Sequence, residues 1–219
     1  MPAETAAKLL AHFESIALRS GDILYKSGER ARYVYFPASC FVSLQYLSRS
    51  GGAVEIAAVG TDGLVGVSSL LSSPSTDHAV IEVGGTAIRM PADVLTAQVV
   101  ELEPLRVMFY SYLHALLSQI AQTAACNTLH TLSQRFSRWL LECGDRLDTS
   151  ELPATQELIA RLLGVRRESI NHVATGLHEA GVLQNGRGHM QILDRARLES
   201  VACECHGIIR REYARLLDR

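Results

Sequence analysis

Residues 154–177, ATQELIARLLGVRRESINHVATGL, constrain the fold of this chain more than any other segment. Thr155 is a good N-cap for a first helix. The apolar face of that helix is formed by Leu158, Ile159, Leu162 and Leu163. Gly164 suits the left-handed residue that ends a helix, and a second helix can begin within about two residues of it. Two helices joined by so short a turn cross steeply, so we expect the start of the second helix to project outward.

The outward residues of this second helix carry the chemistry of base recognition. An arginine can bond O6 and N7 of guanine together, and a glutamate can accept from N4 of cytosine. We therefore predict that the bases of duplex DNA are read by Arg167, Glu168, Asn171 and His172. Phosphate contacts fix the register of a protein on DNA, and we assign them to Thr155, Gln156 and Arg166. The alternative is a charged helix end that is merely solvated.

The segment that follows has the pattern of a β-hairpin. Short apolar runs at residues 182–184 and 190–193 flank Asn-Gly-Arg-Gly at residues 185–188, which are typical turn residues. A hairpin directly after a helix-turn-helix is a wing. We therefore expect Arg187, at its tip, to contact a DNA phosphate, and we expect a last helix over residues 195–217.

Residues 105–130 predict one long helix, because no Gly or Pro follows Pro104 in this stretch. Its apolar residues recur at alternating spacings of four and three, which is typical of a seam between two helices. The predicted dimer seam consists of Phe109, Leu113, Leu116, Ile120, Thr123 and Asn127. The alternative is a helix that packs only on its own domain. A further amphipathic helix over residues 132–147 is expected to bury Phe136 and Trp139.

Between residues 21 and 91 the pattern changes to short β-rich runs separated by Gly, Ser, Asp or Pro. Regular short strands with such turns predict an antiparallel roll, of the cupin-like double-stranded β-helix kind. A short helix is expected before it, at about residues 5–18. The fold class is thus α+β. The domains are a sensory roll at residues 1–104, a dimerisation helix at 105–130 and a winged helix-turn-helix domain at 131–219.

This order of elements resembles the Crp/Fnr family of bacterial regulators, and the resemblance covers nearly the whole chain. It is most specific at residues 164–170, Gly-Val-Arg-Arg-Glu-Ser-Ile, which are similar to the Gly-x-x-Arg-Glu-Thr-Val core of the family's reading motif. The family's base readers match Arg167 and Glu168, whereas its third reader, usually an arginine, is His172 here. The resemblance implies a homodimer on a two-fold DNA site that recruits or blocks RNA polymerase.

The sensor half departs from the cyclic-nucleotide-binding members of that family. Those members hold the ribose with a Gly-Glu pair and the cyclic phosphate with Arg-Ser or Arg-Thr. The matching positions here are Val67 for the glutamate, and Asp77 and His78 for the phosphate ligands. An acid repels a phosphate where an arginine would bind it. We therefore expect a small effector other than cyclic AMP bound in the usual mode, or no effector at all.

Composition and cysteine placement bear on partners and cofactors. The formal net charge of −2 does not favour DNA binding, although a dimer that reads one site with few arginines needs no basic surface overall. The first of five scattered cysteines is Cys40, so an N-terminal iron–sulfur cluster lacks its ligands. Pro2 and His78 match the types that carbon-monoxide-sensing relatives use for haem, but a lone histidine more often serves hydrogen bonding.

The remaining cysteines also argue against a cofactor. On one continuous helix Cys203 and Cys205 would point about 200° apart, so we expect them to pack rather than to bind a metal, and we predict no cofactor. No catalytic constellation nominates an enzyme, and no apolar run suits a membrane span or a signal peptide. We therefore expect a cytoplasmic regulator. The alternative, a thiol-redox or metal sensor that acts through Cys40, Cys126 or the Cys203/Cys205 pair, stays open.

Overall fold

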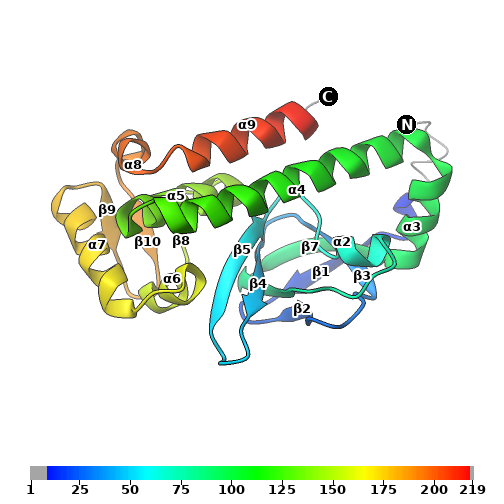
Figure 1. The fold of residues 1–219 in the computed structure, drawn as a ribbon, viewed down its shortest axis with the longest axis horizontal. Helices are drawn as coiled ribbons and strands as arrows, with labels where there is room; N and C mark the ends of the chain where they lie inside the picture. The colour runs from blue at the N-terminus through cyan, green and yellow to red at the C-terminus, as the bar shows by residue number, and fades with distance from the viewer. Residues whose placement is uncertain (1–8, 218–219) are drawn as a thin grey trace.

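The computed structural model describes residues 9–217, and its N-terminal half is an antiparallel β-roll (Figure 1). One sheet has the strand order β1-β7-β3 and the other the order β2-β6-β4-β5. The strands are β1 (Glu14–Leu18), β2 (Ile23–Tyr25), β3 (Tyr33–Pro37), β4 (Phe41–Leu47), β5 (Ala53–Val59), β6 (His78–Val83) and β7 (Gly85–Pro91). The expected β-rich runs therefore form strands, and the α+β class with its N-terminal roll is confirmed.

The helix expected at residues 5–18 is wrong over its second half. Residues 14–18 form β1, which pairs with β7 along its whole length. Sheet pairing satisfies every second backbone group of this edge strand, and no helical apolar face is left for the segment to bury. Residues 5–8 of that prediction lie outside the described residues.

Three helices belong to this part of the chain, one between β5 and β6 and two after β7. They are α2 (Val67–Leu70), α3 (Ala92–Glu101) and α4 (Glu103–Leu129). Pro104 stands in the first turn of α4, where its missing N–H costs nothing. Figure 1 shows α4 running along the roll and on to the C-terminal half of the chain, so this one helix touches both.

The C-terminal half begins with α5 (Leu132–Leu147), whose Thr131 and Gln134 form a reciprocal capping box. The remaining elements are β8 (Glu151–Leu152), α6 (Gln156–Leu163), α7 (Arg167–Glu179), β9 (Leu183–Asn185), β10 (Met190–Ile192), α8 (Arg195–Val201) and α9 (Cys205–Leu217). β8 pairs with β10 and makes the wing a three-stranded sheet. The two-residue strand β8 was not expected, because its sequence is too short to show a period.

The single last helix expected over residues 195–217 is also wrong. α8 ends at Val201, and its C-cap residue Ala202 is extended, with φ −65° and ψ 157°. α9 then begins at Cys205 and packs along α4. The intervening residues 202–204 are therefore not helical, so Cys203 and Cys205 do not lie on opposite sides of one continuous helix.

One of the hydrophobic cores contains residues of both halves. Phe41 of the roll meets Trp139 of α5 edge to face, with ring centroids 5.9 Å apart, and both are completely buried. The indole N–H of Trp139 donates to the carboxyl of Glu55 across the same boundary, at 3.1 Å. Arg161 of α6 forms an ion pair with Glu82 of β6 at 3.0 Å. The C-terminal half is thus held on the roll by packing and by charge.

The predicted dimer seam does not describe a free surface of α4. Phe109, Leu116 and Thr123 are buried within their own chain, and Leu113, Ile120 and Asn127 are only partly exposed. Phe109 and Leu113 pack in a core with residues of α3, and Leu116 and Ile120 pack in a core with residues of the roll and α9, because the most apolar stripe of a helix packs into its own core. For these residues the alternative, a helix that packs on its own domain, describes the structure.

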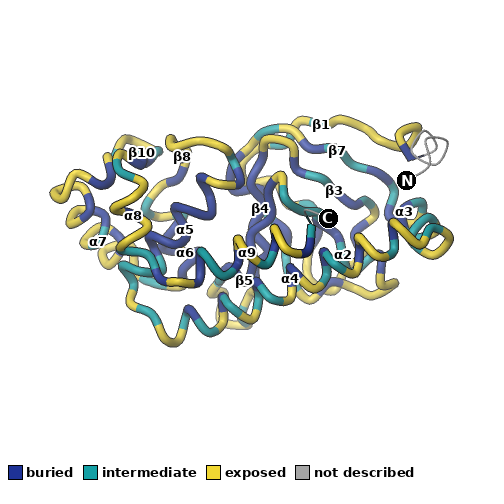
Figure 2. The backbone as a smooth tube through the Cα atoms, turned by 90° about the horizontal axis from the view of Figure 1, so that it is seen from above, coloured by how far each residue is buried: buried dark blue, intermediate teal, exposed yellow. Residues whose placement is uncertain are grey.

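A different stripe of α4 is exposed, and it has the heptad spacing. Figure 2 shows exposed positions recurring along α4. Its members, three and four residues apart in alternation, are Val107, Tyr110, His114, Leu117, Ala121, Ala124 and Thr128. Leu117, in the middle of the stripe, is 64% exposed. A mostly apolar stripe at this spacing, with an occasional polar member, is typical of a seam between two helices.

Candidate nucleic-acid interface

The local geometry of α6 and α7 is that of a helix-turn-helix. The hydroxyl of Thr155 accepts from the backbone N–H of Leu158 at 3.0 Å and so caps α6. Gly164 ends α6 in the left-handed region, with φ +66°, which strains any residue with a Cβ. After this turn α7 begins at Arg167, and its buried side consists of Ile170, Ala174 and Leu177. These features leave the first turn of α7 at the surface.

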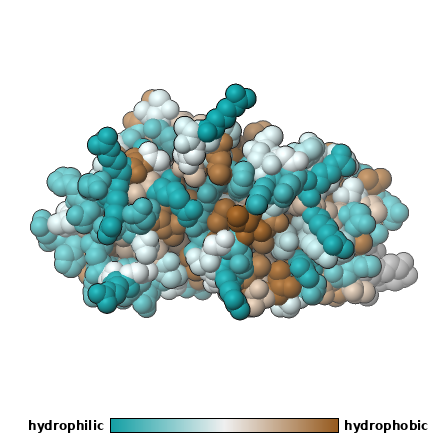
Figure 3. All heavy atoms as spheres, turned by 90° about the horizontal axis from the view of Figure 1, so that it is seen from below, coloured by the Kyte–Doolittle hydropathy of each residue, from teal (hydrophilic) through white to brown (hydrophobic). Residues whose placement is uncertain are grey.

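The residues predicted to read bases lie on that surface. Arg167, Glu168, Asn171 and His172 are all exposed. The Arg167 side chain is 66% exposed, and its contact with Glu157 spans a loose 3.8 Å, which contributes little in water. The guanidinium group is therefore available to a ligand. Figure 3 shows that the end of the molecule carrying α7 is covered mostly by hydrophilic side chains.

A hollow of about 470 Å³ separates the start of α7 from the wing. It is lined by residues of the α6 N-terminus, by Arg167 and by the turn between β9 and β10, which carries Arg187 and His189. The amide of Asn185 donates to the carbonyl of Ala174 at 3.4 Å, which ties the wing to α7. Thr155, Gln156 and Arg187 thus border the same hollow as Arg167, whereas Arg166 is exposed at the N-cap of α7.

Two family models match the chain, and together they cover more than half of it. Residues 15–101 match the cyclic nucleotide-binding domain, and residues 134–201 match the Crp-like helix-turn-helix domain. The chain belongs to the Crp/Fnr family of transcription regulators. Its cyclic-nucleotide-binding-type half is the roll, and its Crp-like half carries the exposed α7.

Solved structures of Crp/Fnr regulators share this fold at low sequence identity. FixK2 from Bradyrhizobium japonicum is 19% identical, with a TM-score of 0.75 over 87% of this chain and 98% of that one. A regulator of the family from Eubacterium rectale is 19% identical, with a TM-score of 0.72 over 92% and 94%. The c-di-GMP responsive regulator CLP from Xanthomonas campestris is 18% identical, with a TM-score of 0.69 over 88% and 100%. None of the curated proteins matches this sequence.

The positions expected to form an effector pocket lie in the roll half of the chain, and none of them is an arginine or a lysine. The Tyr25 hydroxyl donates to the Asp77 carboxyl at 2.9 Å, and burial raises the pKa of Asp77. Charged or neutral, this carboxyl offers a phosphate no positive group. Val67 begins α2, and the Nδ1 atom of His78 is buried without a hydrogen-bond partner among the described residues.

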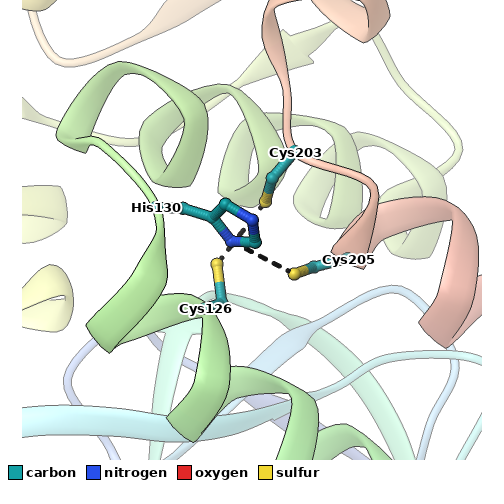
Figure 4. A group of neighbouring side chains, drawn as sticks. All are labelled: Cys126, His130, Cys203 and Cys205. Atoms are coloured by element: carbon teal, nitrogen blue, oxygen red, sulfur yellow. Dashed lines mark hydrogen bonds between the residues drawn. The ribbon is translucent and has the colours of Figure 1, made fainter.

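The structure also brings together three cysteines that the sequence left only as alternatives and a histidine that it did not indicate. Cys126 and His130 from the end of α4 meet Cys203 and Cys205 from the junction of α8 and α9 (Figure 4). Their ligand atoms all lie within 4.8 Å of one another. The i, i+4 spacing of Cys126 and His130 was the available signal, because it places two ligands on one side of a helix. The helix assumed over residues 195–217 concealed the other two.

A second group that sequence reasoning missed lies where α5 meets the roll. Glu142 accepts from Arg138 at 2.6 Å and from Arg146 at 3.4 Å, and all three side chains are buried. Arg146 also pairs with Asp62 of the roll at 3.2 Å. Burial raises the pKa of the neighbouring Glu55 to about 8.

No helix among the described residues is long and apolar enough to cross a membrane.

Proposed function

We propose that this Crp/Fnr regulator acts as a homodimer that binds a two-fold DNA site and reads it with Arg167 and Glu168. The observation that carries the proposal is the exposure of both side chains at the outward tip of α7. An arginine and a glutamate at that position have complementary partners on a G·C pair in the major groove. Asn171 and His172, one turn further along α7, extend the same reading surface.

The bordering residues supply contacts to the backbone of the duplex in this proposal. Arg187 is exposed at the rim of the hollow beside Arg167, and Arg166 is exposed at the N-cap of α7. Thr155 and Gln156 lie at the N-terminus of α6, where free backbone N–H groups favour an anion. Four such contacts fix the orientation of the protein without reading sequence, and the choice of bases is left to α7.

We expect Arg167→Ala to weaken binding to the specific site by about 1–3 kcal/mol, and to relax the choice of base at one position. The loss arises because a bidentate contact to guanine has no replacement. The specific duplex is first obtained by selection from a random pool, and affinities are then measured at one fixed salt concentration on it and on single-base variants. Binding to random DNA should change much less, because phosphate contacts provide most of that affinity.

Arg166→Ala is the matched control for Arg167→Ala, since it removes an adjacent exposed arginine that we assign to phosphate. It should weaken specific and random duplexes alike and reduce the slope of log affinity against log salt by about one. If Arg167→Ala instead lowers affinity equally for specific and random duplexes, Arg167 reads no base. A selected site without two-fold symmetry would contradict the dimeric arrangement.

The dimer in this proposal forms along the exposed heptad stripe of α4 rather than along the buried one. A second copy of α4 placed against it would cover Leu117 and the small side chains of Ala121 and Ala124, and would leave His114 and Thr128 to set the register. The two reading helices would then face successive grooves, one helical turn of DNA apart. RNA polymerase remains the partner that the family resemblance suggests.

The effector of this regulator is not cyclic AMP in the usual mode, because the phosphate would meet Asp77 and His78 instead of an arginine. We expect calorimetry to detect no saturable cyclic-AMP binding, since an acid at that position opposes an anion. The CLP relative is described as c-di-GMP responsive, so the fold is not restricted to one nucleotide. A thermal-shift screen then separates a regulator with another small effector from one without, because an effector of the folded state raises the melting temperature. Saturable binding of cyclic AMP would refute the expectation.

A further inference from the structure

Cys126, His130, Cys203 and Cys205 are brought together by two elements that are far apart in the sequence. Cys126 and His130 lie one turn apart at the end of α4, and His130 is the C-cap residue of that helix. Cys203 and Cys205 flank Glu204 where α8 has ended and α9 begins. The break in the helix between them allows both thiols to turn to the same side, and Figure 4 shows all four side chains pointing toward one centre.

The distances within this group suit four ligands of a single ion. The Sγ atoms of Cys126 and Cys203 are 3.5 Å apart, and the Sγ of Cys205 is 3.5 Å from Nδ1 of His130. A tetrahedral ion with ligand bonds of about 2.3 Å has ligands roughly 3.8 Å apart. Only small movements of the side chains would be needed to place one ion at equal distance from all four.

Plain packing does not account for the composition of this group. The three thiols form a buried cluster of their own, apart from the three larger hydrophobic cores of the described residues. Their neighbours are polar, with the amide of Gln122 donating to the Sγ of Cys205 at 3.1 Å. A disulfide between Cys126 and Cys203 would use only two of the thiols. It would not explain why the side chains of Cys205 and His130 point toward the same centre.

Outer contacts are arranged as they are around protein-bound zinc. Nε2 of His130 lies 3.3 Å from a carboxyl oxygen of Glu204, so that carboxylate can fix the tautomer in which Nδ1 is free to bind a metal. A zinc ion with three thiolates carries one net negative charge, which the nearby guanidinium groups of Arg135 and Arg138 offset.

We propose that Cys126, His130, Cys203 and Cys205 bind one structural zinc ion, which fastens the end of α4 to the junction of α8 and α9. The three thiolates and one imidazole are a ligand set typical of structural zinc. Four protein ligands leave no open position, so the ion holds the fold and catalyses nothing. The ligands of an iron–sulfur cluster bind different irons and lie further apart than these four atoms do.

The test uses the full chain, purified under reducing conditions without chelator and freed of any affinity tag. We expect about one zinc ion per chain by mass spectrometry of the elements. Replacement by Co²⁺ should give the intense absorption of a tetrahedral cobalt–thiolate site. X-ray absorption should report Zn–S distances of about 2.3 Å and one Zn–N distance of about 2.0 Å.

Variants locate the ion within the chain. Cys203→Ser and Cys205→Ser should lose the bound zinc, whereas Cys40→Ala and Cys143→Ala, at buried cysteines outside the group, should keep it. If a ligand variant fails to fold, Glu204→Gln gives the answer, because the Glu204 side chain is 68% exposed and lies beside Nε2 of His130, the ring nitrogen that does not bind the ion. It should keep the ion with about 10- to 100-fold weaker affinity against a chromophoric chelator.

Three results would overturn the proposal. The first is a reduced, folded wild-type chain that takes up neither zinc nor cobalt. The second is zinc content that is unchanged in Cys203→Ser, which would make the metal adventitious. The third is a Cys126–Cys203 disulfide in the isolated chain together with no metal uptake after reduction, which would make this group a redox pair instead.

Discussion

Leu117→Glu is expected to convert the protein into a monomer and to lower its affinity for a two-fold DNA site by about 100-fold or more. Leu117 is 64% exposed at the middle of the heptad stripe of α4. In the proposed dimer it meets its own copy, so the substitution places two carboxylates against each other in an apolar seam. A monomer binds each half-site separately and loses the gain in affinity that two linked contacts provide, which is commonly about 10²- to 10⁴-fold.

Analytical ultracentrifugation measures the oligomeric state, and titration of a labelled duplex measures the affinity. Leu71→Glu is a matched control, because Leu71 is an equally apolar residue, 55% exposed, at the end of α2 and away from the stripe. It should leave both the dimer and the affinity unchanged. A Leu117→Glu chain that still sediments as a dimer would move the interface to another surface.

The second large effect is expected from Glu142→Gln, which should lower the free energy of unfolding by about 3–5 kcal/mol. The Glu142 side chain is 5% exposed and lies between Arg138 and Arg146. The substitution leaves two buried guanidinium groups with less negative charge than they need. Asp62 still compensates Arg146, but Glu55 compensates little at pH 6, because burial raises its pKa to about 8.

Urea denaturation at pH 6 measures this loss, with Glu199→Gln as the control. Glu199 also pairs with an arginine four residues before it on a helix, at 2.9 Å, but its side chain is 44% exposed. Exposed pairs of this kind contribute at most about 1 kcal/mol, so the control should unfold near the wild-type midpoint. Equal midpoints for the two variants would show that the buried network adds nothing to stability.

The elements that the sequence predicted well are those with a local signal. The helix-turn-helix follows from Thr155, Gly164 and the apolar face between them. The roll follows from alternating strands with turn residues between them. Both patterns depend on backbone preferences and on periodicity, which are properties of a few neighbouring residues.

The elements that the sequence did not predict depend on contacts between distant segments. α4 carries two stripes with heptad spacing, and the spacing alone does not tell which of them faces the roll. The stripe with the larger apolar side chains, such as Phe109 and Leu116, packs inside the chain, and the stripe left for a partner includes His114 and Ala121. Residues 202–204, where α8 and α9 are separated, contain no Gly or Pro, so the sequence carries no local signal that predicts the end of a helix there.

The edge-to-face contact of Phe41 with Trp139 has a consequence for genetics. The side chain of Phe41 comes from the roll, and that of Trp139 comes from α5, which packs against α7. A substitution that removes either ring therefore weakens the packing of the roll and of the C-terminal half together. A substitution at Phe41 would therefore be scored as a promoter-recognition defect, although Phe41 lies on β4 of the roll and not in the helix-turn-helix. Protein levels measured alongside transcription will separate such substitutions, which weaken the fold, from those that remove a contact to DNA.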